Sequence, residues 1–390
     1  MFDILNLEQA PGDIVRLMQE LQDWTIRDIA RRIRQHGTIP PTAEYQIHRL
    51  HDLGMFDADL KREIQRALNL SDAQINALYS EAAQSAFLYD KRAFLSHGIP
   101  FIPYSENFFL KRMVGDIALQ TQDAMRNITR SMGFAVREPG GVVFKPAAQF
   151  YQSELDLATM KVSTGVETLE QSIRQAVRKM VESNLRTVDY ASGRTDSIDV
   201  AARRAVFNGL KELTNRQSDY NSALIGSTLF EISWHGGYRP SHRWGGRRYD
   251  TMGTPPYPTE QQLYERYTSD KGEIGTLGDV NCYHIKYAVF PDTPPTYTDA
   301  QLDQMHEEQM EKKTFEGREY NQYEARQKQR AIERAMRDSR SIIAGIKGGE
   351  LEGDLTAARS RYTQQRRKYK EFSAAMGLRT EFERVFTGMV

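Results

Sequence analysis

The feature that most constrains the fold of this chain is a helical repeat of apolar residues near its start. From residue 14 to residue 33, apolar side chains recur mostly at three- and four-residue steps, which is the spacing of one face of an α-helix. The members of this stripe are Ile14, Leu17, Met18, Leu21, Trp24, Ile29 and Ile33. Gly37 and the pair Pro40–Pro41 predict where this helix ends.

Similar patterns predict further helices along the first 225 residues. They are expected near residues 42–53, 57–68, 71–95, 107–131 and 147–183, and another begins near Asp196 or Ser197. Ser71 is predicted to cap the third of these, because Gln74 stands at the capping-box spacing. The segment GFAVREPGGVVFKP (133–146) predicts a β-hairpin, since two β-branched and aromatic runs flank Pro-Gly-Gly.

The pattern changes between about residues 230 and 295, where glycine, proline, tyrosine and arginine dominate and helical periodicity largely disappears. The segments TLFEISW (228–234) and NCYHIKYAVF (281–290) favour strands through their β-branched and aromatic content. A proline-set linker, PDTPPTYT, follows. The tail beyond it is predicted to be helical and highly charged, with 14 basic and 7 acidic residues from Arg318 to Lys370.

The predicted fold is therefore mainly α, with a small α+β, loop-rich module (about 230–295) between helical N-terminal and C-terminal regions. Four ranges are expected along the chain, since its length is usual for two or three domains. They are a helical N-terminal region (1–150), long helices leading into the module (151–230), the small α+β His/Cys module (231–295) and the charged helical tail (296–390).

Composition excludes several broad classes of protein. The 52 lysines and arginines equal the 52 aspartates and glutamates, so no overall charge draws the chain to nucleic acid or to a membrane. The single cysteine excludes an internal disulfide and fits a reducing compartment. We expect no signal peptide and no bilayer-spanning segment, because neither a basic-then-apolar start nor a run of about 18 apolar residues occurs. We therefore expect the protein to be made and kept in the cytoplasm.

Four side chains of the kinds that bind metals stand close together in the module. WHGGYRPSHRW (234–244) supplies His235 and His242, and NCYH supplies Cys282 and His284. Residues two apart on a strand point to the same face, so Cys282 and His284 are predicted to converge. Imidazole and thiolate are ligands that zinc prefers, which makes zinc the expected cofactor of such a set.

The spacing of these four residues leaves three interpretations open. All four suit a closed structural zinc site, and three of them with a water molecule suit a catalytic one. The most common outcome for histidines beside glycine and proline is a polar network that holds loops, and a lone cysteine is often a small core residue. No catalytic residue can be assigned, because the carboxylates Glu231, Asp250 and Glu260 are too scattered along the chain to predict an acid/base pair.

Arginine and aromatic residues crowd the same stretch. Arg239, Arg243, Arg247 and Arg248 alternate with Trp234, Tyr238, Trp244 and Tyr249. Such a mixture can hold a nucleic-acid backbone, although stacking inside a loop-rich core is the favoured interpretation. The basic tail helix is likewise expected to be solvated or partner-facing, with contact to DNA phosphates as the alternative. No individual nucleic-acid-binding residue can be named.

The order and spacing of several motifs resemble a known family. The motifs are NLRTVDYASGRTDSIDVAARRAVFNG, EISWHGGYRPSHRWGGRRYD, VNCYH, YTDAQLDQM and EGREYNQYEARQKQRAIERAMR, over roughly residues 185–345. In this order they resemble the minor capsid protein 2 family of tailed bacteriophages, which is similar to the Mu F-like head morphogenesis proteins. Two features depart from the family pattern: Tyr283 stands where an arginine is usual, and no second cysteine precedes Asn281.

The resemblance implies a structural protein of the virion. Proteins of this kind are carried inside the capsid in several copies per head, associate with the portal protein and other capsid subunits, and aid head assembly and DNA passage, so packaged DNA is a further expected partner. The N-terminal region is expected to dock on the portal. Four further residues are expected to hold the module together: Arg239, Trp244, Gly246 and Asn281. The alternative is a metal-dependent hydrolase or nucleic-acid-processing protein packaged with the DNA.

Overall fold

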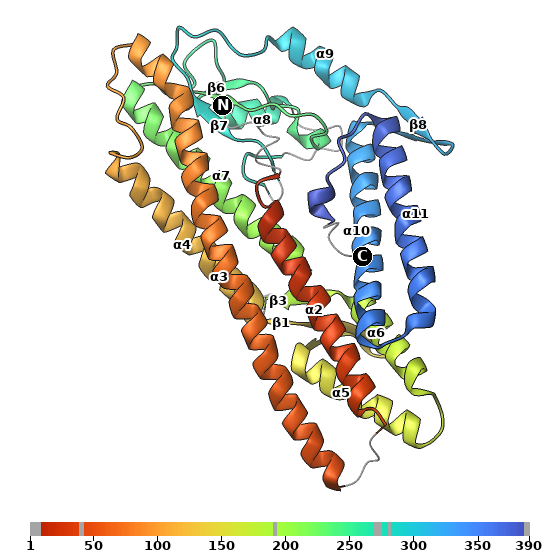
Figure 1. Ribbon diagram of the computed structural model, residues 1–390. Helices are drawn as coiled ribbons and strands as arrows, with labels where there is room; N and C mark the ends of the chain where they lie inside the picture. The colour runs from red at the N-terminus through yellow and green to blue at the C-terminus, as the bar shows by residue number, and fades with distance from the viewer. Residues whose placement is uncertain (1–8, 39–42, 190–192, 268–274, 280–281, 386–390) are drawn as a thin grey trace.

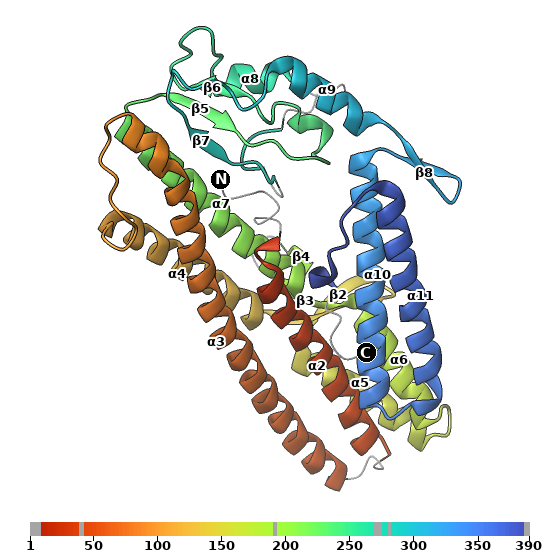
Figure 2. The ribbon, with the colours of Figure 1, turned by 45° about the horizontal axis from the view of Figure 1, so that its top comes forward.

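The computed structural model describes residues 9–38, 43–189, 193–267, 275–279 and 282–385. It is mainly helical with small antiparallel sheets, which confirms the predicted fold class. Long helices form an elongated body, the strands β5–β7 with α8 and α9 lie at one end of it, and α5 and α6 lie toward the other (Figures 1 and 2). None of the helices in these ranges combines the length and apolar character that a membrane crossing needs.

The elements have the following bounds. The helices are α2 (Gly12–His36), α3 (Ala43–Ser96), α4 (Phe108–Arg130), α5 (Ala147–Ser163), α6 (Leu169–Ser183), α7 (Ile198–Ile225), α8 (Glu260–Arg266), α9 (Asp299–Met310), α10 (Gln322–Gly348) and α11 (Glu352–Met376), with short 3-10 turns η1 (Pro240–His242) and η2 (Phe382–Arg384). The strands are β1 (Met132–Glu138), β2 (Gly141–Pro146), β3 (Leu185–Val188), β4 (Thr195–Ser197), β5 (Leu229–Ile232), β6 (Arg248–Asp250), β7 (Lys286–Ala288), β8 (Lys313–Phe315) and β9 (Arg318–Tyr320).

Helix α2 confirms the apolar stripe and occupies the centre of the helical body. It packs against α3, α7 and α10, and it lies between α3 and α10 in both ribbon views (Figures 1 and 2). The stripe is buried on this helix, with Met18, Ile29 and Ile33 fully enclosed. Burial on several sides explains why so many of its positions are apolar.

The predicted helix boundaries were wrong in two regions. The three segments expected between residues 42 and 95 form one helix, α3, of 54 residues. Ser71 is no N-cap: its hydroxyl donates to the Leu68 carbonyl inside the continuous helix (3.0 Å), a bond that serine can make within any helix. Conversely, the helix expected over 147–183 is two, because Gly165 adopts a left-handed φ of +73° and Thr168 with Gln171 forms a capping box that starts α6.

The predicted hairpin is present and belongs to a small sheet. Strands β1 and β2 pair antiparallel, and the sheet order is β2-β1-β3-β4. Ser197 is the N-cap residue of α7, which confirms where that helix starts. The sheet therefore joins the hairpin to the strands just before α7.

The module contains a second sheet, in the order β6-β5-β7. Strand β5 confirms the strand predicted in TLFEISW. The strand expected over 281–290 is shorter, because β7 covers only Lys286–Ala288 and the Cys282 amide instead closes a turn by donating to the Asp279 carbonyl (2.9 Å). The pair Cys282 and His284 therefore lies just before β7 and not in a strand.

The tail begins with α9 and a short hairpin, β8–β9, that was not predicted, and ends with the helices α10 and α11. Helices α10 and α11 pack against each other, and α10 also lies along α2 (Figure 1). Arg340 of α10 is buried and contacts Asp23 of α2 (2.7 Å). The expected amphipathic tail helix is thus a part of the helical body.

One large core cluster joins residues from Ile14 to Leu351, and smaller clusters lie under the α10–α11 pair and inside the module. The large cluster reaches the module through Ile285 and Phe290. The division into four ranges stays a prediction, since packing does not say which ranges fold alone.

Candidate metal centre

Two hydrogen bonds between Ser233 and Ile285 bring the two predicted metal-binding segments together. Strand β5 leads into Ser233, whose amide donates to the Ile285 carbonyl (2.8 Å). The Ser233 hydroxyl in turn accepts from the Ile285 amide (3.0 Å). The chain after β5 is therefore fixed beside the chain before β7, so that His235 and His284 become neighbours although 49 residues separate them along the chain.

His242 returns to the same place through a tight turn. Pro240 starts the turn η1, and the His242 amide closes it by donating to the Arg239 carbonyl (2.8 Å). Proline suits the first position of such a turn because its φ is already set and it lacks an N–H to satisfy. Trp244 follows, fully enclosed, with its indole N–H donating to the Gly275 carbonyl (2.8 Å).

Three of the four predicted ligands converge. The candidate ligand atoms of His242, Cys282 and His284 all lie within 4.8 Å of one another. The sulfur of Cys282 is 3.6 Å from Nδ1 of His284. A tetrahedral zinc ion with ordinary Zn–S and Zn–N lengths would set two such ligand atoms about 3.6 Å apart. The spacing of this pair therefore suits coordination to one ion.

Burial sets the protonation of these three groups. All are at most 2% exposed. Burial, with the nearby charge of Arg239, lowers the pKa of His242 to about 4. Burial, with His235 and His242 close by, lowers the pKa of His284 well below its ordinary value. Both imidazoles are therefore neutral near pH 7, which is the form that binds metals.

Burial also raises the pKa of the Cys282 thiol, so the sulfur carries its proton at neutral pH. A bound cation would displace that proton, as metals do at thiolate sites. Nε2 of His242 and Nε2 of His284 are buried without a hydrogen-bond partner among the described residues. Buried ring nitrogens normally have one. Nε2 of His242 has Asp279 nearby at 3.8 Å, and Nε2 of His284 lies against Gly245, whereas Nδ1 of His284 is the nitrogen beside the sulfur of Cys282.

Two glycines let the histidine rings lie where they do. A Cβ on Gly245 would stand 2.6 Å from Nε2 of His284. A Cβ on Gly275 would stand 2.3 Å from Cδ2 of His242. Contacts below 3.0 Å are essentially absent for real Cβ atoms, so both positions need glycine for the rings to approach the backbone.

The fourth predicted ligand, His235, lies beside the cluster and not in it. Its ring centroid is 4.3 Å from that of His284, but its nitrogens are not among the three converging ligand atoms. Its Nδ1 is 3.1 Å from the carbonyl of Gly236. His235 is thus placed to support the orientation of His284.

The remaining predicted module residues have distinct positions. Arg239 lines a hollow beside the cluster, and the Trp244 ring packs 4.7 Å from that of His284. Gly246 has a φ of +83°, and a Cβ there would meet Leu302 of α9 at 2.4 Å. Asn281 falls outside the described residues.

Sequence patterns missed several residues that complete the module. Asp279 lies 3.8 Å from Nε2 of His242, and no spacing signal links the two in the chain. Asp303 of α9 contacts both Arg243 (3.3 Å) and Arg247 (2.9 Å). Long-range pairs of this kind depend on how the loops fold.

The three scattered carboxylates also have local partners. Glu231 pairs with Arg248 across the β5–β6 ladder (2.7 Å). Asp250 accepts hydrogen bonds from the backbone of the turn after β6, and Glu260 accepts one from the hydroxyl of Tyr264. These contacts stabilise strands, a turn and a short helix.

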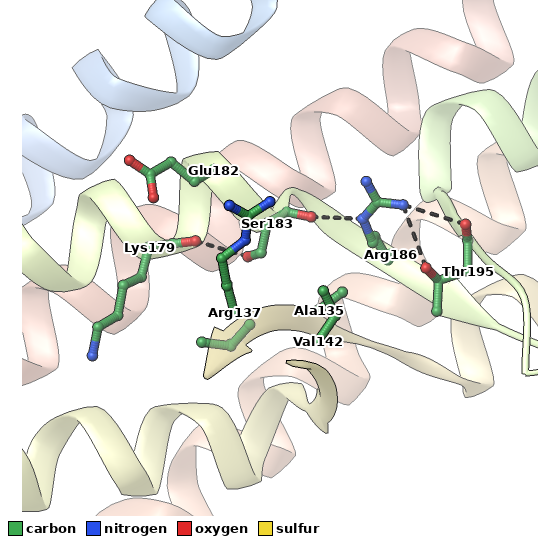
Figure 3. Close-up of a pocket in the computed structure, with 9 residues that line it drawn as sticks. Ala135, Arg137, Val142, Lys179, Glu182, Ser183, Arg186 and Thr195 are labelled. Carbon is green, nitrogen blue, oxygen red and sulfur yellow. Dashed lines mark hydrogen bonds between the residues drawn. The ribbon is translucent and has the colours of Figure 1, made fainter. Parts of the chain in front are cut away.

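A second hollow, of about 690 Å³, lies between α6 and the sheet β2-β1-β3-β4 (Figure 3). Arg186 donates there to the carbonyl of Ser183 (2.7 Å), and its other end reaches Thr195. Lys179 bonds Glu154 (2.9 Å). Glu182 adds an acidic side chain to the lining. Lys179 thus joins α6 to α5, and Arg186 joins the end of α6 to β4, and no metal-binding cluster was found among the described residues of this hollow.

Comparison with known proteins gave one match. The model of a family described as phage minor capsid protein 2 matches residues 5–374 of this chain. No curated protein matches significantly. No solved structure matches significantly either. The family match covers the helical body, the module and most of the tail.

Proposed function

The chain belongs to the phage minor capsid protein 2 family, and from this membership we propose that it sits inside the phage head next to the portal, where it aids head assembly and DNA passage. The observation that carries the proposal is the family match, which extends over residues 5–374. Membership makes the chain a phage capsid protein, and virion location follows from that class. The portal as partner is the proposed step.

The shape and charge of the helical body support this role. Long helices that share one core make a rigid body suited to docking against other head subunits. The outer side of α11 is basic, with exposed side chains at Arg359, Arg361, Arg366, Arg367 and Lys370. We propose that the basic side faces packaged DNA, because clustered cations bind phosphates through release of counterions.

Fractionation of intact particles tests the location. Heads are purified on a gradient, treated with protease and nuclease, and analysed by mass spectrometry. The chain should be protected inside heads at a small number of copies relative to the major shell protein, and cross-linking should join it to the portal. Recovery in the soluble fraction, or loss on protease treatment of intact heads, would overturn the location.

We further propose that zinc bound by His242, Cys282 and His284 stabilises the module. The support is the convergence of three buried ligand atoms, two neutral imidazoles and the 3.6 Å spacing of sulfur and nitrogen. A zinc ion would tie His242 of the turn η1 to Cys282 and His284 in the chain before β7, beside the place where Ser233 and Ile285 already hydrogen-bond. The role of the metal would be structural, because all three ligands are enclosed.

Metal analysis of tag-free protein purified without chelator tests the zinc. About one zinc ion per chain is expected, since a closed site should be filled. Less than about a tenth of a zinc ion per chain would rule out the zinc site. Cobalt substitution should give tetrahedral d–d bands and a sulfur-to-cobalt band that Cys282→Ser abolishes. His306→Gln is the matched control, because His306 is a half-buried histidine of α9 that bonds Tyr238 outside the cluster.

A further inference from the structure

A hollow of about 590 Å³ lies beside α3, where this helix passes the end of α4 and the joint between β2 and α5. Its floor is apolar and consists of Leu60, Ile64 and Leu68 of α3 with Met132 of β1. Three of these side chains are at most 9% exposed, and Ile64 packs against the large core cluster. We name this hollow the α3 groove. Its volume falls in the range of ligand pockets, which is roughly 300–1,000 Å³.

The groove stays open because one of its walls has short side chains. The three floor residues of α3 follow one another at four-residue steps, so they form one row along that helix. The wall beside this row is built from Pro146, at the end of β2, and from Ala147 and Ala148, which begin α5. A proline ring and two methyl groups leave the space along the row free for a ligand.

The dimensions of the groove suit a short extended peptide. The row from Leu60 to Leu68 spans eight residue steps of helix, which is about 12 Å at 1.5 Å per residue. An extended chain advances about 3.3 Å per residue, so about four peptide residues would follow the row.

Two side-chain amides in the lining offer hydrogen bonds to such a peptide. The amide nitrogen of Gln65 donates to the side-chain oxygen of Asn69 (2.7 Å). This bond leaves the side-chain oxygen of Gln65 as an acceptor and the amide nitrogen of Asn69 as a donor. A peptide backbone carries an N–H and a C=O group for both, whereas a plain hydrocarbon chain carries neither.

Arg130 gives the groove its net charge. Two acidic and three basic side chains are among the described residues of the lining. Lys61 pairs with Asp57 (2.6 Å), and these two charges balance. Arg126 likewise pairs with Asp72 (2.9 Å). The side chain of Arg130, the last residue of α4, makes no ion pair or hydrogen bond with any residue that the structure describes. Its guanidinium matches a carboxylate through two parallel hydrogen bonds.

We propose that the α3 groove binds the C-terminal end of a partner protein whose last residues are apolar and extended, with the terminal carboxylate paired to Arg130. The apolar row accepts the side chains, and the amides of Gln65 and Asn69 hold the backbone. A fatty acid shares the apolar body and the carboxylate, but it leaves both amides without a partner. The groove shares no residue with the metal cluster, so it stands independently of the zinc.

Titration calorimetry on the whole protein tests the groove with a set of acetylated five-residue peptides. Each ends in three residues chosen from valine, leucine, isoleucine and phenylalanine, and each is made with a free C-terminal carboxylate and as the amide. The acids should bind at least about tenfold more tightly than the matching amides, because the amide loses the charged hydrogen bonds to Arg130.

Three results of these titrations would overturn the assignment. Equal binding of acids and amides removes the role of the carboxylate. Absence of binding by every peptide at millimolar concentration removes the peptide. Decanoate is the third probe, and its binding without that of any peptide assigns the groove to a fatty acid.

Variants of two arginines on α4 then locate the carboxylate. Arg130→Gln should weaken binding of the acids about tenfold and change that of the amides less than about twofold. Arg112→Gln is the matched control, since it removes the same charge from a 73% exposed position on α4 outside the groove. Weakening of the acids by the control as large as that by Arg130→Gln would show general charge attraction and would overturn the site.

A second pair of variants locates the body of the peptide. Ala148→Leu should weaken acids and amides alike, because the larger side chain occupies the groove. Ala58→Leu makes the same change at an exposed position of α3 outside the groove, and binding should stay within about twofold of the wild type. Thermal unfolding of each variant is recorded beside the titrations. Unchanged binding by a folded Ala148→Leu variant would place the peptide elsewhere and overturn the site.

Discussion

Glu231 and Arg248 form an ion pair that is buried on both sides, at 6% and 4% exposure of the side chains. They stand opposite each other on β5 and β6, and Arg248 also donates to the carbonyls of Thr293 and Pro294. A buried pair contributes little net stability relative to apolar residues, but each partner depends on the other. The pair therefore fixes the register of the two strands.

Replacement of Glu231 with glutamine should lower the free energy of unfolding by about 3 kcal/mol, because Arg248 would keep a buried charge without its counter-charge. Urea denaturation measures the loss. Arg248→Met added to this variant should cost clearly less than Arg248→Met alone, so the two losses should not add. Additive losses in this double-mutant cycle would contradict the pairing.

Asp199 is a second buried charge, in the first turn of α7. Its carboxylate lies 3.3 Å from Nε of Arg337 and accepts from the Val200 amide (2.9 Å). Burial alone would raise the pKa of Asp199, but Arg337 and the hydrogen bonds outweigh it and lower that pKa. Burial raises the pKa of the neighbouring Asp338, so the pKa values of the two carboxyl groups shift in opposite directions.

A lowered pKa makes the contribution of Asp199 depend on pH. The contribution of Asp199 to the free energy of unfolding is complete above its pKa in the unfolded chain, which is about 3.9. This contribution is lost as pH falls through the pKa of Asp199 in the folded protein. Asp199→Asn should therefore destabilise the protein by about 1–3 kcal/mol at neutral pH. The difference from the wild type should shrink below about pH 4.

Denaturation at several pH values measures the effect. The control is Asp116→Asn, whose carboxylate is 63% exposed and 3.9 Å from Arg112. Its difference from the wild type should stay near zero at every pH. A constant loss for Asp199→Asn down to pH 2, about two units below the unfolded pKa, would rule out the linkage.

The candidate site shows what spacing can and cannot predict. The pairing of Cys282 with His284 followed from two positions of separation, and the two side chains do meet, although they lie before β7 and not in a strand. That His242 lies near Cys282 and His284 was only one of several interpretations of the sequence, because its position depends on the turn that begins at Pro240. No sequence pattern pointed to Asp279, since only the folded loops bring its carboxylate close to His242.

At the scale of elements, the sequence predicted the presence of helices better than the residues at which they begin and end. Amphipathic periodicity identified α2, α4 and α10 because each carries an apolar stripe that packs into a core. It failed inside α3, where capping-type residues such as Ser71 were taken for a boundary. A local cap signal is weak against the packing that keeps a long helix continuous. Between α5 and α6 the error was the opposite one: the sequence pattern predicted one continuous helix, whereas the structure has two.

Two helical glycines make a matched test of how the helices cross. A Cβ on Gly209 of α7 would stand 2.1 Å from the hydroxyl of Tyr79 on α3 and 2.4 Å from that of Thr121 on α4. Those two hydroxyls share a hydrogen bond of 2.9 Å, so Gly209 marks the point where three helices meet. A Cβ on Gly115 of α4 would meet nothing within 4 Å.

Gly209→Ala should therefore destabilise the protein by about 1–3 kcal/mol, because the added methyl group forces the Tyr79–Thr121 contact apart. Gly115→Ala should stabilise it by up to about 1 kcal/mol, since alanine is the better helix former and the space is open. Chemical denaturation of both variants measures the contrast. Equal effects at the two positions would contradict the close crossing at Gly209.

At the scale of the whole molecule, two helices of equal length differ sharply in burial. Helices α2 and α11 each have 25 residues, but α2 buries fifteen and α11 buries five. Helix α2 packs against α3, α5, α6, α7 and α10, whereas α11 packs against α10 and β8. The basic side of α11 adds repulsion between its exposed cations.

This difference in burial predicts that α11 opens locally while α2 stays folded. Amides of α2 should exchange with solvent only through global unfolding, because α2 cannot leave the core without exposing its neighbours. Amides of α11 should exchange through a local opening that costs at least about 2 kcal/mol less. Native-state hydrogen exchange followed by mass spectrometry measures both helices in one sample, so each serves as the control for the other. Equal protection would mean that α11 belongs to the same cooperative unit as α2, and the basic side would then be held as rigidly as the core.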